Sequence, residues 1–170
     1  GVDVFINYWG SPYMAHPILS FDFGRDGRIC FSIETRPEKG EAYSALGGLY
    51  RQFELIYVVA DERDVIGLRT NHRHNPPEQV YLYRLQGSLE NARRLFMAYV
   101  ERINQLHQRP EFYNTLTTNC TTSIWMSSQV NEQHLPFSWK LLASGYVPQY
   151  LHEQGRLLGG QRPFAELQRE

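Results

Sequence analysis

Strand patterns in the first half of the chain and helical patterns in the second predict an α+β domain rather than a wound parallel sheet. At 170 residues the chain has the size of one domain and can bury a substantial core. Aromatic residues make up 14% of it, which suits a fold containing a sheet, because aromatic side chains pack well on pleated surfaces. No repeat, low-complexity tract or linker divides the sequence, so we expect a single domain over residues 1–170.

Four segments have the composition of strands. Residues 18–23 are short and aromatic, residues 24–27 have the chemistry of a hairpin turn, and residues 28–35 follow as a second strand. Residues 52–60 and 79–85 are two further strands. We therefore expect a small antiparallel sheet.

The charged segment 61–77 separates the last two strands and ends in two prolines, which predicts a turn with a short helix and an exposed loop. Such a segment is usually a solvated turn with salt bridges, and nothing in the sequence supports a substrate-binding role for Arg63 or Arg69. His72 and His74 could offer two metal ligands on an extended segment. No Cys or His pair at metal spacing accompanies them, so we expect no metal and no cofactor. A metal-dependent hydrolase using these two histidines is a remote alternative.

The second half is helical. Ser88 can cap a helix over residues 89–106, whose apolar residues recur at helical spacing until Arg109 and Pro110 end it. A second helix begins near Asn119 and runs towards Val130. Short helical turns interrupted by proline and glycine make up the remainder.

The charge balance narrows the classes of partner. Seventeen basic and 18 acidic residues give a net charge of −1 without any long run of one sign, so we expect no binding to nucleic acid. The longest apolar runs are far too short to span a bilayer. No signal peptide is recognisable, and since the chain opens with Gly1 rather than Met, we expect that an original leader is missing.

Cys120 is the candidate nucleophile. Thr118 or Asn119 can cap the helix that follows, which places Cys120 in its first turn, where the helix dipole and unpaired N–H groups stabilise a thiolate. The alternative is an ordinary buried cysteine, but the Thr, Asn and Ser residues around it are poor company in a core. By the same test Cys30, between Ile29 and Phe31, is structural. A disulfide between the two cysteines stays open for an oxidising compartment.

A thiolate nucleophile needs a nearby histidine held by a third polar group. His16 directly precedes the first aromatic strand, although it could equally be a surface or capping histidine. Glu34 lies towards the open end of the expected hairpin, where its carboxylate could orient His16, and Ser32 on the same face is the reserve candidate. In the competing interpretation Glu34 forms a structural ion pair with Arg36 or Arg51.

Four pieces of the chain, at residues 15–23, 31–36, 57–64 and 113–122, resemble the Lnb N-terminal periplasmic domain family of bacterial envelope proteins. The resemblance covers residues from about 5 to about 150 and keeps the order of the four pieces. That family in turn looks like the circularly permuted branch of the NlpC and papain-like thiol enzymes, which includes lecithin retinol acyltransferase. The resemblance therefore implies a permuted papain-like fold, with the Cys-bearing helix packed on the sheet, in the periplasm or cell envelope.

Carried over by position, the resemblance implies that Cys120 is the nucleophile, His16 its base and Glu34 the third residue. Asn119 precedes the nucleophile and would help to form the oxyanion hole, and Tyr113 would face the same pocket. The acyltransferase-like members carry an acidic residue and His after the Cys, whereas Thr121 and Thr122 stand here. That departure argues against lipid acyl transfer.

These features predict a thiol hydrolase, a peptidase or amidase with acyl transfer as a variant. It would act on amide or ester bonds of peptides, peptidoglycan stems or lipid-linked groups in the envelope. The alternative is a non-catalytic envelope module that binds a partner through residues 61–77. The sequence leaves undecided whether residues 61–77 close over the site as a lid.

Overall fold

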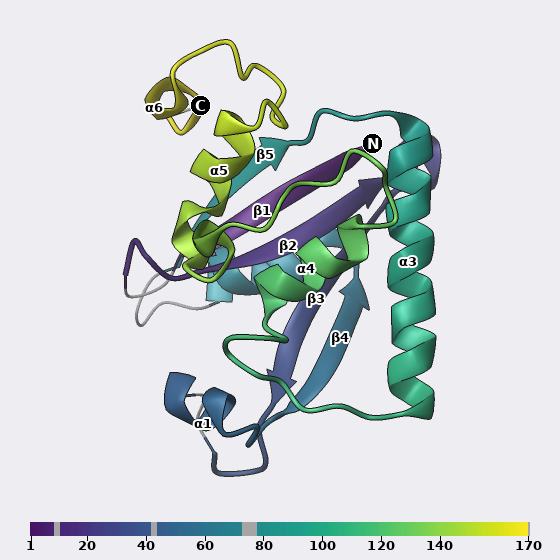
Figure 1. The fold of residues 1–170 in the computed structure, drawn as a ribbon, viewed down its shortest axis with the longest axis vertical. Coiled ribbons are helices and arrows are strands. Elements are labelled where there is room, and N and C mark those ends of the chain that lie inside the picture. Colours follow the sequence, from purple (N-terminus) through teal and green to yellow (C-terminus); the bar gives the residue numbers. More distant parts are fainter. Residues whose placement is uncertain (9–10, 42–43, 73–77, 170) are drawn as a thin grey trace.

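The computed structural model describes residues 1–8, 11–41, 44–72 and 78–169. It is an α+β fold built on a five-stranded antiparallel sheet with the strand order β4-β3-β2-β1-β5 (Figure 1). The strands are β1 (Val2–Tyr8), β2 (Ala15–Asp22), β3 (Arg28–Arg36), β4 (Glu54–Ala60) and β5 (Gln79–Arg84). The helical elements are η1 (Gly24–Asp26), α1 (Ala45–Leu49), α2 (Glu62–Gly67), η2 (Leu68–His72), α3 (Leu89–Gln108), α4 (Cys120–Ser128), η3 (Trp139–Leu141), η4 (Ser144–Tyr146), α5 (Val147–Glu153) and α6 (Phe164–Leu167).

The four predicted strands and both long predicted helices are present, with ends shifted by up to three residues. The first strand, β1, was not predicted. It lies between β2 and β5, and its apolar residues Val2, Val4 and Ile6 alternate with residues of the opposite face. That alternation is the signal that would have identified it.

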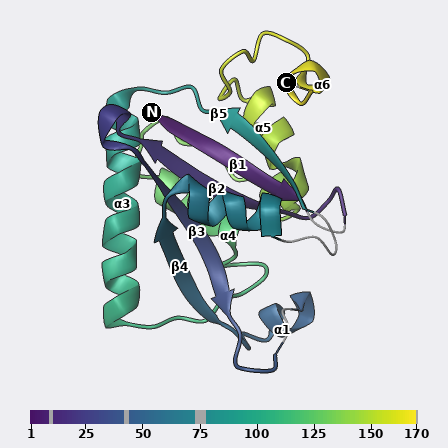
Figure 2. The same cartoon turned by 180° about the vertical axis from the view of Figure 1, so that it is seen from behind.

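The two faces of the sheet are covered by different helices. Helices α3 and α4 cover one face (Figure 1). Leu19, Phe31 and Tyr99 of α3 belong to the larger core on that face. The opposite face is crossed by α2 and η2, the unlabelled blue-green helix over β2 and β3 in Figure 2. A smaller apolar cluster there includes Ile18 and Cys30.

The strands β2 and β3 separate at one end of the sheet. Their pairing runs from Asp22–Arg28 to Ile18–Ser32 and ends there, while β3 stays paired with β4 as far as Arg36. Residues 15–17 of β2 and 33–36 of β3 therefore border an opening in the sheet, which we call the fork. Because α4 contacts both β2 and β3, its first residues can meet side chains of the opposite face at the fork.

Candidate functional site

The start of α4 holds Cys120 in a fixed place. Asn119 caps the helix: its side-chain oxygen accepts from the backbone N–H of Thr122 at 2.8 Å, and the Thr122 hydroxyl accepts from the backbone N–H of Asn119 at 3.0 Å. The Asn119 side-chain nitrogen donates to the Thr115 carbonyl at 2.7 Å. The cap predicted at Thr118 or Asn119 is thus formed by Asn119, and it leaves Cys120 at the positive end of the helix.

His16 lies on β2 at the fork, and its ring is held on one side by β3. Its Nε2 atom is 2.8 Å from the Ser32 hydroxyl oxygen and 3.2 Å from Oε1 of Glu34. The Ser32 hydroxyl donates to that same Glu34 oxygen at 2.6 Å. Since the Ser32 hydroxyl donates its proton to Glu34, the Ser32 oxygen accepts from Nε2–H of His16.

Cys120 and His16 are hydrogen-bonded neighbours, and both are buried. Burial alone would lower the pKa of the His16 ring. The negative charge on Cys120, the hydrogen bond to its side chain and the contact with Glu34 outweigh that effect and raise the pKa to about 9. The raised pKa favours a positively charged His16 ring between Cys120 and Glu34.

Arg69 completes the polar chain from η2, on the α2 face of the sheet. It lies on η2, is only 5% exposed, and forms an ion pair with Oε1 of Glu34. Burial would raise the pKa of Glu34, but the hydrogen bond and charge of His16, the charge of Arg69 and the Ser32 hydrogen bond hold it far below its usual range. Glu34 is therefore a carboxylate at every pH at which the protein would work.

The remaining predicted residues lie at different distances from this chain of contacts. Tyr113 is buried in the larger core, and its backbone N–H donates to the Phe53 carbonyl at 2.8 Å. Its place in a pocket and the oxyanion role of Asn119 stay predictions. His72 ends η2, whereas His74 lies outside the described residues, so the metal alternative stays a prediction as well.

Two competing expectations for the charged and sulfur-bearing groups are wrong. Glu34 does form an ion pair, but among the described residues its partner is Arg69 rather than Arg36 or Arg51, and Arg36 instead lies 3.5 Å from Glu54 on the surface. Cys30 and Cys120 are free thiols, so the disulfide left open by the sequence is not formed.

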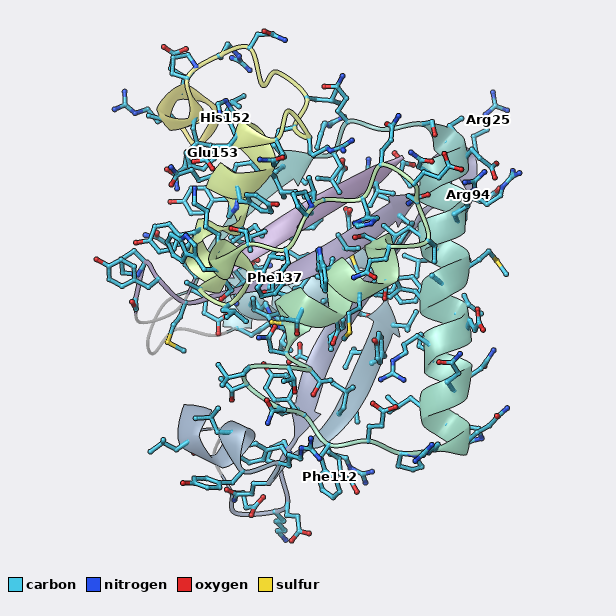
Figure 3. All side chains as sticks on the ribbon, viewed as in Figure 1. Arg25, Arg94, Phe112, Phe137, His152 and Glu153 are labelled. Carbon is cyan, nitrogen blue, oxygen red and sulfur yellow. The ribbon has the colours of Figure 1, made fainter. Side chains whose placement is uncertain are left out.

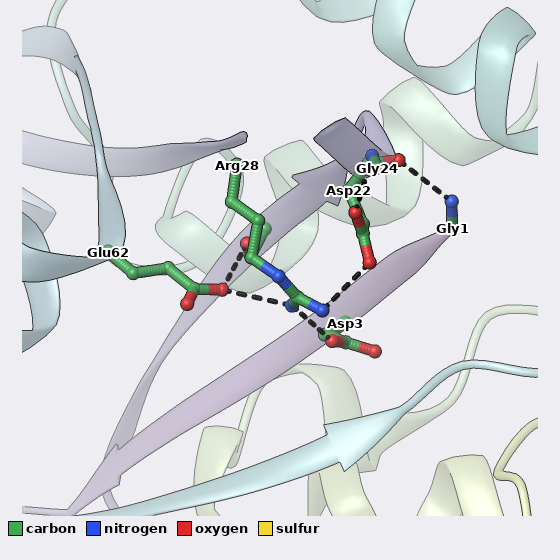
Figure 4. A network of polar contacts seen from close by, with 7 residues as sticks. Gly1, Asp3, Asp22, Gly24, Arg28 and Glu62 are labelled. Carbon is green, nitrogen blue, oxygen red and sulfur yellow. Dashed lines mark hydrogen bonds and ion pairs between the residues drawn. The ribbon is translucent and has the colours of Figure 1, made fainter. Parts of the chain in front are cut away.

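Cys30 has polar neighbours of its own on the α2 face. Burial raises the pKa of its thiol to about 11, although a hydrogen bond with Ser20 acts the other way. The Ser20 hydroxyl donates to Glu62 at 2.6 Å, and Arg28 lies 3.2 Å from the same Glu62 oxygen (Figure 4). Arg28 also bonds Asp3 and Asp22, so this network ties three strands and α2 together.

A cavity of about 650 Å³ lies on the α4 face of the sheet, and neither Cys120 nor His16 is among its lining residues. Its wall includes Pro17 and Thr121, which directly follow His16 and Cys120 in the chain. Arg94 of α3, labelled in Figure 3, belongs to its polar part. Most of the wall is apolar and comes from β1, β2, α3, α4 and the segments after α4, with Val4, Leu19, Leu95, Ile124, Leu141 and Leu151 among its residues.

The model of the Lnb N-terminal periplasmic domain matches residues 1–145, which include the whole Cys120–His16–Ser32–Glu34 set. The chain belongs to the family of Lnb N-terminal periplasmic domains. The family is periplasmic, and this gives the location of the domain. No curated protein and no solved structure matches the chain. No helix among the described residues is both long and apolar enough to cross a bilayer.

In this Lnb domain the sequence alone missed one member of the polar chain and mistook the arrangement of two others. Ser32 was expected only as an alternative to Glu34, yet in the structure Ser32 contacts His16 and also donates to Glu34. Arg69 had no support in the sequence because 35 residues separate it from Glu34. A single arginine facing inward from a charged helix has no local pattern that distinguishes it from its solvated neighbours.

Proposed function

We propose that this periplasmic domain is a thiol enzyme that cleaves an ester or amide by forming a thioester on Cys120. The observation that carries the proposal is the buried hydrogen-bonded contact between Cys120 and His16, backed by Ser32 and Glu34. A nucleophile, a base and a group that orients the base are the parts that such chemistry needs.

The proposed reaction has two steps. The Cys120 thiolate attacks the carbonyl carbon, a C–S bond forms, and the carbonyl electron pair moves to oxygen. The backbone N–H of Cys120, which has no partner within the helix, faces that oxyanion. The intermediate collapses, and the leaving alcohol or amine takes a proton from the His16 imidazolium.

In the second step His16 removes a proton from water or from an acceptor amine, which attacks the thioester carbonyl. The C–S bond breaks, Cys120 leaves as thiolate, and the acid or new amide is released. The charge state of the dyad is restored, because His16 is again an imidazolium beside the thiolate.

The cavity supports an apolar acyl group as the part of the substrate that is transferred. About 650 Å³ is within the usual range for small-molecule sites, and the wall is mainly aliphatic next to Pro17 and Thr121. Thr121 and Thr122 replace the acidic residue and histidine of acyltransferase-like relatives, which had argued against lipid acyl transfer. The size and lining of the cavity favour acyl groups nevertheless.

The order of the chain supports a permuted papain-like version of the fold. The His-bearing strand β2 comes first, the polar partners on β3 follow, and the Cys-bearing helix α4 comes late. A single such domain over the whole chain is part of the proposal.

The experiment that tests this function offers p-nitrophenyl esters of increasing acyl length to the purified domain. We expect a burst of p-nitrophenol and an acyl adduct on Cys120 by peptide mass spectrometry, lost in Cys120→Ser and strongly slowed in His16→Asn. Longer chains should react faster, and Ile124→Trp, which fills the cavity, should remove that preference. Adding a primary amine separates transfer from hydrolysis.

Cys30→Ser is the matched control, because Cys30 is buried among apolar residues on the other face and should not affect the burst. Absence of an adduct with every ester, or an adduct that forms equally well without His16, would contradict the proposal. The partner-binding module would then be the better explanation.

A further inference from the structure

One oxygen atom of Glu34 receives three polar groups from three different elements. Oε1 accepts from the Ser32 hydroxyl of β3 at 2.6 Å, lies 3.2 Å from Nε2 of His16 on β2, and pairs with Arg69 of η2. Because the three share one oxygen, a displacement of Glu34 by any of them changes the position of the other two.

We propose that Arg69 is a positioning residue of this site: it holds the Glu34 carboxylate in place, and through Glu34 and Ser32 it fixes the orientation of the His16 ring. The inference rests on the proposed function, since it adds Arg69 to the same site. It assigns a role to the α2–η2 segment, which the sequence presented as a solvated turn.

The burial of Arg69 argues against an ordinary surface ion pair. The side chain of Arg69 is 5% exposed, whereas that of Arg36, paired with Glu54, is 70% exposed. A guanidinium taken out of water must be compensated by a carboxylate and by further hydrogen bonds. Glu34 supplies the charge, and the Val65 carbonyl accepts from the second terminal nitrogen at 2.7 Å.

The hydrogen bond to Val65 also explains how the Arg69 guanidinium is oriented towards Glu34. Val65 is a buried residue of α2, one turn before Arg69, so this contact anchors the guanidinium to its own helix. The other terminal nitrogen then points at Glu34 from a rigid support. The Nε atom of Arg69 has no hydrogen-bond partner among the described residues, so the contacts with Glu34 and Val65 hold the guanidinium in place.

Few charged groups act on Glu34. Arg69 faces it from η2 and His16 from β2, while Cys120 on α4 faces His16, and the β4 residue paired with Glu34 is the apolar Ile56. If Arg69 is neutralised, His16 is the one remaining cation at Glu34 in the described part of the chain. Burial then favours protonation of the carboxyl group, and a protonated Glu34 no longer accepts from both Ser32 and His16.

The test compares Arg69→Gln with the charge-preserving Arg69→Lys and with Glu34→Gln in a protein labelled with ¹³C at glutamate side chains. Glu34→Gln assigns the Glu34 carboxyl signal. In the wild type that signal should stay that of a carboxylate through the acid range, and in Arg69→Gln its titration should move upward by at least about one pH unit. Arg69→Lys should keep it ionised.

The second readout is the alkylation rate of Cys120 between pH 4 and pH 8. Arg69→Gln should lower this rate by about tenfold at acid pH, and it should have no further effect in a Glu34→Gln background, because Arg69 acts through Glu34. Should Arg69→Gln not fold, the neutral pair Arg69→Gln/Glu34→Gln and the Arg69→Lys variant give the same comparison without an unpaired buried charge.

An unchanged Glu34 titration in Arg69→Gln, or an equal loss of alkylation with and without Glu34, would overturn the assignment. The titration does not depend on turnover. If Cys120 formed no acyl adduct while Glu34 still responded to Arg69, the proposed function would fail and the assignment of Arg69 would stand.

Discussion

The two cysteines of this domain are both buried and both free, yet the polar groups that act on their sulfurs differ. Cys30 faces Ser20, which bonds Glu62, which in turn contacts Arg28. Cys120 faces His16, and behind it come Ser32, Glu34 and Arg69, again a serine, a glutamate and an arginine. In the Cys120 set a histidine lies next to the sulfur, where the Cys30 set has a serine.

That histidine changes what burial does to the thiol. Around Cys30 burial and the charges of Glu62 and Asp61 outweigh the Ser20 hydrogen bond and the charge of Arg28, and the pKa of the thiol is raised to about 11. Around Cys120 the carboxylate of Glu34 stabilises a positive His16, which can balance a thiolate where water cannot. On the proposed function, Cys120 is therefore the reactive thiol and Cys30 the inert one, because only Cys120 has a neighbour that can hold a proton.

The largest expected difference between the two sites is in alkylation. Iodoacetamide should label Cys120 rapidly, with labelling that persists well below pH 8.5, the pKa of a free thiol being about 8.5. Cys30 should label slowly and only as the pH approaches about 11. The measurement is peptide mass spectrometry of the two cysteines across pH.

His16→Ala tests whether the histidine is the cause. It should slow the labelling of Cys120 by about 100-fold near neutral pH and leave that of Cys30 unchanged. Equal rates at the two cysteines, or a Cys120 rate that is indifferent to His16, would remove the distinction on which the comparison depends.

The second expected effect is on the titration of His16 itself. In the wild type its ring nitrogens should titrate at about 9, as followed by ¹⁵N NMR. In Cys120→Ser the negative charge and its hydrogen bond are gone while burial remains, so the pKa should fall by more than about one unit. Cys30→Ser is the control and should leave it at about 9. A His16 pKa that ignores Cys120 would mean that the two groups are not coupled.

Part of this arrangement could be predicted from the sequence because it is local. The polar surroundings of Cys120, the cap at Asn119 and the alternation of β3, which places Ser32 and Glu34 on one face, all depend on residues within a few positions. The α+β class follows in the same way from the order of strand and helix patterns.

The rest depends on contacts between distant segments. The fork exists because β2 and β3 stop pairing at Ile18–Ser32, which no composition signal marks. Arg69 reaches Glu34 across 35 residues, from η2 on the α2 face of the sheet. The strand β1 carries the alternation of a strand, but its central place between β2 and β5 is set by pairing with residues 15–22 and 79–84, which its own residues do not reveal.

A third prediction concerns the backbone that supports His16 and has no counterpart at Cys30. Gly145 of η4 lies against the segment before β2: its N–H donates to the Tyr13 carbonyl at 3.1 Å, and a Cβ atom there would lie 2.7 Å from the Tyr13 carbonyl carbon. Gly145→Ala should therefore displace this segment and destabilise the fold by about 1–3 kcal/mol in urea denaturation.

The same variant should slow alkylation of Cys120 without exposing Cys30. Gly87→Ala is the control, because no atom lies within 4 Å of the position that its Cβ would occupy. If Gly145→Ala were as stable as Gly87→Ala, the η4 segment would not be what fixes the start of β2.

The smallest expected effect separates two roles of Asn119. Asn119→Ala removes the cap of α4 and should cost about 1 kcal/mol of stability, with slower alkylation of Cys120. Asn119→Asp and Asn119→Ser can still accept from the Thr122 N–H and should restore the stability.

Because neither variant carries the amide N–H₂, the rate of thioester formation in these two variants decides between the capping role and the oxyanion role of Asn119. Rates close to the wild type would mean that Asn119 acts through the cap alone, since its amide nitrogen already donates to Thr115. Rates as low as in Asn119→Ala, with stability restored, would instead mean that the amide turns towards the oxyanion during the reaction.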